Sequence, residues 1–266
     1  LMGYEIDFIP VGEGEKSGDA ISLRFGNLHG KRDEYKVVVV DAGFKESGGE
    51  QLVSHIKKYY NTDVVDLAVS THPDSDHISG LDVILNELKV KELWMHQPWN
   101  HTSGISSMFK DGRVTDNSIR ETLKNSLNSA MDLEKIAKAK NIPIKEPFTG
   151  LQFANYLFVV GPTKNYYESL LPGFRATPEP KKSVAADFIA RMAEAVKKIA
   201  ENFDYETLDD SGETSAENNS SAILMLESDE RYSLFTADAG IPALTNVINV
   251  LDYITFDYEK LKFVQV

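Results

Sequence analysis

One short segment of the chain concentrates side chains that can bind a metal ion. Residues 71–77 read Thr-His-Pro-Asp-Ser-Asp-His, so two histidines and two aspartates lie within six positions. Imidazole nitrogens and carboxylate oxygens are common ligands of divalent ions in proteins. The whole chain contains only six histidines, which makes two in one turn unusual. We therefore predict a metal site that includes His72, Asp74, Asp76 and His77.

A purely structural role would explain part of this segment. Asp76 can cap the helix expected after it, and Asp74 can stabilise the turn that precedes that helix. Neither role accounts for the two histidines in the same turn. The metal interpretation is therefore favoured.

Hydrolysis is the chemistry expected of such a site. A bound divalent ion lowers the pKa of a coordinated water from about 15.7 towards roughly 7 at the best zinc sites. Asp76 is the candidate catalytic residue, which holds or deprotonates that water. The chain has no Cys, so the ligands are nitrogen and oxygen only. An oxygen-rich set moves the choice towards Mn²⁺ or Mg²⁺ and leaves Zn²⁺ open, for one ion or two.

The elements around the segment alternate between strands and helices. An apolar strand is predicted over 64–70, directly before the cluster, and a helix over 78–88, directly after it. Strand, helix and strand in quick succession are typical of an α/β layered fold. Further strands are predicted over residues 5–11, 19–25, 35–40, 92–96, 153–160, 221–226, 232–236 and 261–266, and further helices over 49–60 and 241–253.

The middle of the chain is expected to be mostly helical. A polar amphipathic helix is predicted over 116–140, and apolar residues recur at helical spacing from Val184 to Phe203. Packing against the body of the protein is the favoured interpretation of that stripe, and a dimer contact is the alternative. Residues 204–218 carry six acidic side chains and no basic one, which predicts an exposed loop.

Composition limits the classes of function. The 28 Lys and Arg against 41 Asp and Glu give a formal net charge of −13. This charge argues against tight, sequence-independent binding of nucleic acid, which depends on basic side chains. The absence of Cys excludes disulfides, thiolate zinc sites and thiol nucleophiles. Because there is no long apolar run and no signal-like N-terminus, we expect a cytoplasmic protein without membrane contact.

The segment His72-x-Asp74-x-Asp76-His77 resembles the metal motif of the metallo-β-lactamase superfamily, in the variant with Asp in place of a second His. The longer string 70–81 is similar to the hydrolase domain of the competence protein ComEC and its soluble relatives. Four further stretches agree with that family in the same order: 11–14 with 18–21, 38–43, 218–224 and 234–240. The resemblance covers residues 4–96 and 218–266. It implies a single domain over 1–266, an α/β fold of the αββα two-sheet sandwich type, with 102–217 as a largely helical insertion.

The resemblance also implies roles for individual residues. The four motif residues would be metal ligands, and Asp238 would be a carboxylate that bridges two metals. Asp41 would orient a histidine ligand through a hydrogen bond. Asn219 is a lower-ranked candidate. The structural alternative is that Asp41 and Asp238 are only turn residues at the ends of strands.

The sequence lacks two histidines that a dinuclear member normally adds. All six histidines lie at or before residue 101, and the turn at Gly161 and Pro162 offers no ligand. The last strand, ending at Val266, is typically followed in the competence relatives by a His-His-Gly-Ser turn. We therefore expect either a chain that continues past Val266 or an incomplete second metal site. His96 and His101 are candidate substitutes, although histidines beside Trp are more often packing or surface groups.

The competence relatives imply a phosphodiester substrate, either DNA or a nucleotide. The expected function is therefore a metal-dependent phosphodiesterase or nuclease. Two alternatives stay open. One is a hydrolase of a non-phosphate ester or lactone on the same fold. The other is a catalytically degenerate subunit with a structural or regulatory role, whose helical insertion contacts a protein partner or a second copy of the chain.

Overall fold

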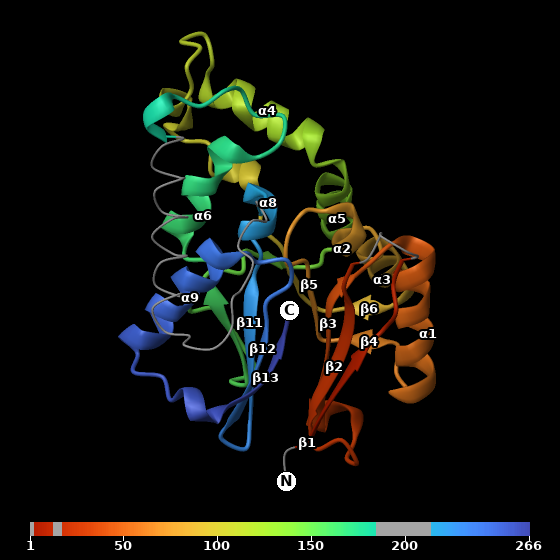
Figure 1. Cartoon of the computed structure of the whole chain (residues 1–266). Helices are drawn as coiled ribbons and strands as arrows, with labels where there is room; N and C mark the ends of the chain where they lie inside the picture. The colour runs from red at the N-terminus through yellow and green to blue at the C-terminus, as the bar shows by residue number, and fades with distance from the viewer. Residues whose placement is uncertain (1–2, 13–17, 185–213) are drawn as a thin grey trace.

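The computed structural model describes residues 3–12, 18–184 and 214–266. Two β-sheets lie face to face at its centre, and helices cover the outer face of each sheet (Figure 1). One sheet has the strand order β1-β2-β3-β5-β7-β8, and the other has the order β13-β12-β11-β10-β9. This arrangement confirms the predicted mixed α/β fold with two sheets.

The first sheet is antiparallel from β1 to β3 and parallel from β3 to β8. Parallel strands bring their carboxyl ends to one edge of a sheet, and that edge is where ligands usually bind. The strands of this sheet are β1 Gly3–Phe8, β2 Ala20–Gly26, β3 Tyr35–Ala42, β5 Leu67–Val69, β7 Leu93–Trp94 and β8 Ile144–Lys145.

The second sheet is antiparallel except for the parallel pair β12 and β13. Its strands are β9 Gln152–Phe153, β10 Leu157–Gly161, β11 Ile223–Ser228, β12 Arg231–Phe235 and β13 Leu261–Gln265. A small parallel pair, β4 Val64–Val65 and β6 Lys89–Val90, stands beside the first sheet.

The helices connect the strands and cover the sheets. The α-helices are α1 Glu50–Tyr59, α2 Ser75–Ile78, α3 Leu81–Glu87, α4 Asp116–Ser126, α5 Asn128–Ala139, α6 Lys164–Leu170, α8 Ala216–Asn219 and α9 Ile241–Tyr253. Short 3₁₀ turns are η1 Arg32–Glu34, η3 Pro98–Asn100, η4 Ile105–Met108, η5 Leu171–Gly173 and η6 Tyr258–Lys260, and η2 Lys45–Gly49 is a π-helix. Within the described residues, no helix combines the length and apolarity needed to cross a membrane.

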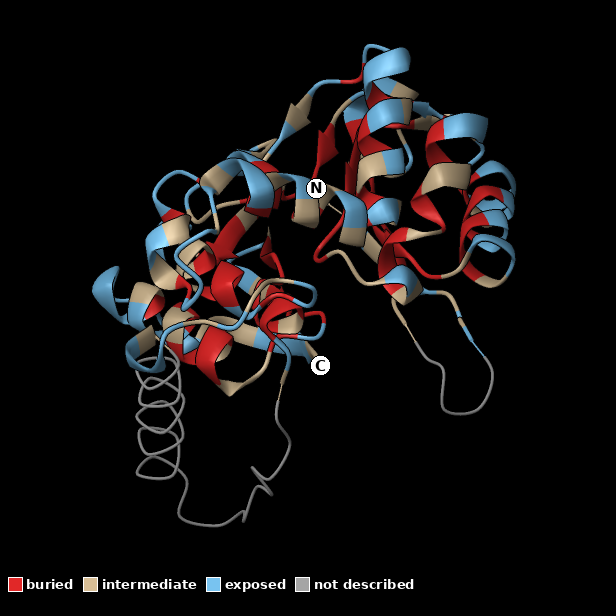
Figure 2. Ribbon diagram, turned by 90° about the horizontal axis from the view of Figure 1, so that it is seen from above, coloured by how far each residue is buried: buried red, intermediate tan, exposed pale blue. Residues whose placement is uncertain are grey.

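The apolar run of β3 is explained by burial on both of its faces. Val38 and Val40 pack between the two sheets, whereas Val37 and Val39 pack against the helical layer. Successive side chains of a strand point to opposite faces, so a strand covered on both sides needs apolar residues throughout. The central strands are accordingly buried along their length in Figure 2.

Two predicted helices differ in the structure, each for a packing reason. The predicted helix over 116–140 breaks at Leu127, which leaves the helical conformation and is buried in the core. The predicted helix over 78–88 begins only at Leu81, as α3, because α2 ends at Ile78 and a turn at Ser79 and Gly80 separates the two helices. A Cβ on Gly80 would lie 2.0 Å from the carbonyl oxygen of Ala42, so only glycine permits this close approach.

The middle of the chain contributes to both sheets. Within residues 102–184, β8 extends the first sheet, and β9 and β10 extend the second. The apolar stripe predicted from Val184 to Phe203 lies, after its first residue, outside the described residues. So does most of the acidic stretch 204–218, although its last residues form α8. The single domain with a helical insertion stays a prediction.

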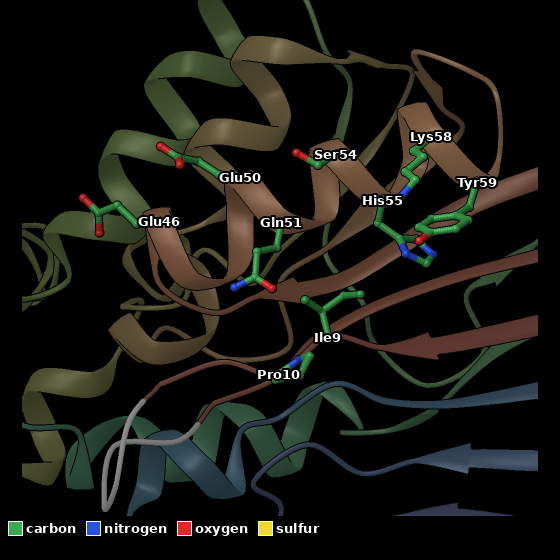
Figure 3. Close-up of a pocket in the computed structure, with 9 residues that line it drawn as sticks. All are labelled: Ile9, Pro10, Glu46, Glu50, Gln51, Ser54, His55, Lys58 and Tyr59. Carbon is green, nitrogen blue, oxygen red and sulfur yellow. The ribbon is translucent and has the colours of Figure 1, made fainter.

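A cavity of about 430 Å³ lies beside α1 (Figure 3). Its walls come from the chain after β1 and from the exposed side of η2 and α1, and they mix acidic, basic and aromatic side chains. His55, which lies in the wall, contacts Asp7 through Nε2 at 3.1 Å. None of the site residues predicted from the sequence lines this cavity.

Candidate metal centre

Five acidic and imidazole side chains meet at the carboxyl-end edge of the first sheet. They come from the segment before β2, the end of β3, the loop after β5, the helix α2 and the loop after β12, and they are Asp19, Asp41, His72, His77 and Asp238. Two groups of three have ligand atoms within 4.8 Å of one another, namely Asp41 with both histidines, and Asp19 with His77 and Asp238. The predicted residues Asp41, His72, His77 and Asp238 are therefore brought together.

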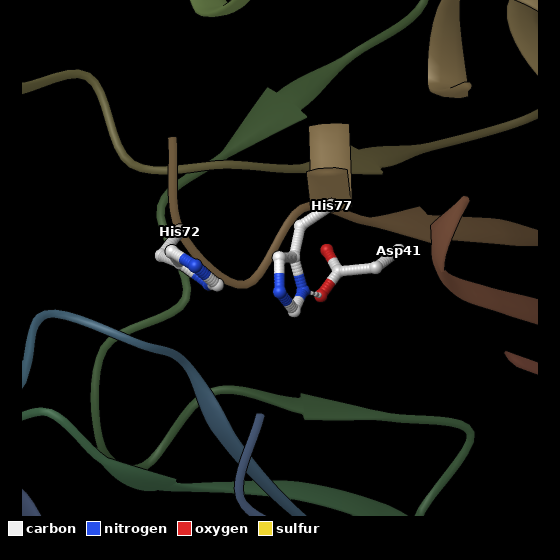
Figure 4. A group of neighbouring side chains, drawn as sticks. All are labelled: Asp41, His72 and His77. Atoms are coloured by element: carbon white, nitrogen blue, oxygen red, sulfur yellow. Dashed lines mark hydrogen bonds and ion pairs between the residues drawn. The ribbon is translucent and has the colours of Figure 1, made fainter. Parts of the chain in front are cut away.

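The buried Asp41 orients His77 by direct contact (Figure 4) and His72 through Thr71. Its Oδ2 lies 3.0 Å from Nδ1 of His77 and accepts the hydroxyl of Thr71 at 2.5 Å. The hydroxyl oxygen of Thr71 lies in turn 3.0 Å from Nδ1 of His72. Since that hydroxyl donates to Asp41, Nδ1 of His72 must donate to it. This network assigns the Nδ1 proton to both rings and leaves each Nε2 for a ligand.

Both Nε2 atoms face the carboxylate of Asp238. The distances are 3.3 Å from His77 to Oδ1 and 3.8 Å from His72 to Oδ2, and the two rings lie 4.1 Å apart. Nε2 of His72 is buried and has no hydrogen-bond partner within the described structure. Nε2 of a charged His77 donates to Asp238, and a divalent ion could take the place of that proton. The buried and unpartnered Nε2 of His72 is the second atom that favours a cation at this point.

The two carboxylates beside His77 favour its charged form. Burial opposes the charged form, but the hydrogen bonds to Asp238 and Asp41 outweigh burial and raise the pKa of His77 to about 11. Burial, together with the neighbouring charge of His77, lowers the pKa of His72. The hydrogen bond from His77 lowers the pKa of Asp238. A divalent ion that binds here would take the place of the His77 proton.

Asp19 is a member of the centre that we did not predict. Its pKa is raised to about 6, first by burial and then by the negative charges of Asp41 and Asp238. Gln265 donates to its Oδ2 at 3.0 Å. A Cβ on the preceding residue, Gly18, would lie 1.9 Å from the carbonyl oxygen of Asp76, so a glycine lets this loop approach α2. The only sequence signal was its place in the family-like stretch 18–21.

The two aspartates inside the motif lie differently from the histidines. Asp74 occupies the N-cap position of α2, but its side chain makes no capping hydrogen bond there. It contacts the guanidinium of Arg175, and burial raises its pKa. Asp76 lies in the first turn of α2, and its carboxylate has no hydrogen bond to another described residue. Neither belongs to the two ligand groups, and their role as ligands stays a prediction.

Asn219 closes the helical turn α8. Its amide donates to the carbonyl oxygens of Thr214 and Ser215 at 3.1 and 3.0 Å. The neighbouring Asn218 instead donates to Oδ2 of Asp238 at 3.3 Å. Asn218 is thus a residue that contacts the centre and that the sequence did not single out, and the role of Asn219 stays a prediction.

His96 and His101 lie in a separate, aromatic environment. His96 stacks on Tyr167 at 4.4 Å, and burial lowers its pKa to about 3. His101 lies between Glu146 and Glu168, each 2.9 Å from one of its ring nitrogens. Neither histidine belongs to a ligand group among the described residues.

Comparison with known proteins finds a family that part of the chain resembles. Residues 32–135 match the model of a family described as the metallo-beta-lactamase superfamily. This stretch, less than half of the chain, is similar to the metallo-beta-lactamase superfamily. The match includes Asp41, His72 and His77, but ends before Asp238. The superfamily suggests a metal-dependent hydrolase, and the α/β two-sheet structure is consistent with its fold, which binds divalent metals.

Solved structures similar to the chain include a metallo-beta-lactamase from Hirschia baltica. It is 18% identical, with a TM-score of 0.23, over 35% of this chain and 38% of that chain. This chain therefore spans well under half of the length of that metallo-beta-lactamase. No curated protein matches the chain.

Proposed function

We propose that the protein is a metal-dependent phosphodiesterase or nuclease, whose ion is held by His72, His77 and Asp238, with Asp19 beside them. One observation carries the proposal: two imidazole Nε2 atoms, oriented from behind by Asp41, converge on one carboxylate. The buried Nε2 of His72 has no other partner in the described structure. Nitrogen and oxygen donors of this kind fit Mn²⁺ or Zn²⁺, and Mg²⁺ is acceptable.

The bound ion would supply a water of lowered pKa and a positive charge opposite the developing negative charge. The chain's own residues would do the remaining work. Asp41 and Thr71 hold the histidine rings in one orientation. Asp76 has a carboxylate that is not engaged by another described side chain, and it precedes the ligand His77 directly. We assign to Asp76 the removal of a proton from the attacking water.

The similarity of residues 70–81 to the competence-protein hydrolases supports a phosphodiester substrate. The net charge of −13 favours a small phosphodiester or a short single strand over a long duplex, because a long tract requires many basic contacts. Asp238 has 38% of its side chain exposed, so substrate can reach the centre from that side. We further propose a cytoplasmic setting, with residues 102–217 as the surface for a protein partner or a second copy.

The test is cleavage of bis-p-nitrophenyl phosphate and of single-stranded DNA in the presence of Mn²⁺. Wild-type protein should cleave at least one of them, His72→Ala should not, and His29→Ala, which changes an exposed histidine, should behave as wild type. Cleavage of esters or lactones without cleavage of phosphodiesters would show that the substrate is a non-phosphate ester or lactone. Absence of both activities and of metal binding would instead identify a non-catalytic subunit.

A further inference from the structure

Arg175 is held at the edge of the metal centre by contacts from two distant segments. Its guanidinium contacts Asp74, which lies 101 residues earlier and two positions after the ligand His72. Its Nε donates to Oε1 of Glu217 at 3.0 Å, and its backbone N–H donates to the same oxygen at 2.6 Å. Glu217 is buried, so this end of the arginine is fixed.

The helical turn α8 connects Arg175 to the centre. Glu217 in this turn fixes Arg175, and the next residue, Asn218, donates to Asp238. One short element therefore sets the position of both a guanidinium and a carboxylate that faces the histidines. The Arg175 guanidinium is therefore placed where it can act together with the metal ion.

Arg175 has unused donors that point to a ligand. A guanidinium carries five N–H groups in a planar fork, which matches phosphate oxygens. One is directed to Glu217 and one to Asp74, and the other three have no partner in the described part of the chain. The side chain is 57% exposed. If Arg175 served only to pair with Asp74, its side chain could be completely buried.

We propose that Arg175 is the second cation of the centre and contacts the phosphate of the substrate. It pairs with Asp74, a residue that would otherwise attract a second divalent ion, so that the centre binds one ion. Its free N–H groups then hold a non-bridging oxygen of the phosphodiester beside that ion. This inference rests on the proposed function, and it makes Arg175 a determinant of specificity for anionic substrates.

Lysine does not reproduce these contacts. A lysine ammonium is a point charge without the planar fork, so it cannot keep Glu217, Asp74 and a phosphate oxygen in place together. Arg175→Lys should therefore retain charge but lose part of the phosphate binding. Comparison with Arg175→Ala separates the contribution of charge from that of geometry.

The test measures Mn²⁺ stoichiometry and the affinity of the Mn²⁺-loaded protein for inorganic phosphate, both by titration calorimetry. Wild type should bind one ion. Arg175→Ala should bind phosphate at least about tenfold more weakly, as expected for loss of a charge-assisted hydrogen bond. It should also gain a second, weaker Mn²⁺ site, because Asp74 is released. Arg175→Lys should be intermediate, and Arg113→Ala, at an exposed pair with Asp111, should match wild type.

Each outcome has a separate meaning. Two tightly bound ions in wild type, or unchanged phosphate affinity in Arg175→Ala, would overturn the role of Arg175 and leave the hydrolase proposal standing. No bound ion in wild type would overturn the proposed function itself. If Arg175→Ala does not fold, Arg175→Lys decides the matter, because phosphate affinity equal to that of wild type would contradict the need for a guanidinium.

Discussion

Two pairs of histidines lie beside carboxylates in the described structure, and their ring nitrogens are engaged differently. His72 and His77 lie at the edge of the first sheet, with their rings 4.1 Å apart. His96 and His101 lie among the aromatic rings of Phe148 and Tyr167. Carboxylates are close to both pairs. Neither the number of histidines nor their burial therefore distinguishes a metal centre.

The difference lies in which ring nitrogens stay available. In the first pair, Asp41 and Thr71 engage the Nδ1 atoms, and both Nε2 atoms turn to Asp238. In the second pair, the glutamates on either side engage both nitrogens of His101, whereas His96 has no partner for either nitrogen in the described structure. A metal centre needs free nitrogens that converge on one point, and only the first pair has them.

The largest expected effect separates the two pairs by metal affinity. His72→Ala removes a ligand, and its Mn²⁺ affinity should fall more than about 100-fold, since even residues that only orient a ligand typically contribute 10–100-fold. His101→Gln should leave the affinity within about threefold of wild type. Titration calorimetry measures both. A similar loss in the two variants would show that the pairs act as one site.

A smaller effect is expected when the orienting carboxylate is changed. Asp41→Asn keeps the shape but cannot accept both the Thr71 hydroxyl and the His77 Nδ1 proton as the carboxylate does. Mn²⁺ affinity should fall by about 10–100-fold. The matched control is Asp66→Asn, at a buried aspartate paired with Arg32 and Lys91. Equal affinity in the two variants would remove the orienting role of Asp41.

His101 of the second pair should contribute to the pH dependence of stability. Burial opposes the charge of His101, but hydrogen bonds to Glu146 and Glu168 raise its pKa. The folded state therefore holds this proton more tightly than the unfolded state. The resulting stabilisation is complete below pH about 6.5 and is lost as pH rises through the raised pKa.

His101→Gln should accordingly lower the free energy of unfolding by about 2 kcal/mol at pH 6, because hydrogen bonds to charged groups contribute on the order of 1.5–3 kcal/mol. The difference from wild type should shrink at higher pH. Urea unfolding of the metal-free proteins at pH 6 and pH 9 measures it. A difference that is independent of pH would contradict the charged state assigned to His101.

The smallest expected effect concerns Thr71, which links Asp41 to His72. Thr71→Val removes the hydroxyl but keeps the volume, and should weaken Mn²⁺ binding by about fivefold, the value of one neutral hydrogen bond near 1 kcal/mol. Thr62→Val, which removes a hydroxyl that binds Arg32, is the control. If Thr71→Val lost as much Mn²⁺ affinity as Asp41→Asn, the hydroxyl, and not the carboxylate, would fix the rings.

How much of this could be predicted depends on how local each signal is. The motif at His72 and His77 is visible because its residues are neighbours in the sequence. Asp238 could be placed only through the resemblance, because it reaches the centre from the other sheet. Asp19, and Arg175 with its proposed phosphate contact, were not predicted, since each is positioned by contacts across the fold that spacing along the chain does not show.

The fold shows the same limits. Apolar patterns predicted the strands and the layered α/β class, because a strand carries apolar side chains on each face that is buried. The break at Leu127 and the start of α3 after Gly80 depend on tertiary packing, which a helical periodicity does not show. Local pattern therefore predicts the elements, and only the assembled structure shows where they must end.

Anomalous diffraction from crystals of the protein loaded with Mn²⁺ tests the central claim most directly. The account predicts a peak between Nε2 of His72, Nε2 of His77 and the carboxylate of Asp238. A peak beside His101 and its two glutamates, or no peak at saturating Mn²⁺, would contradict it.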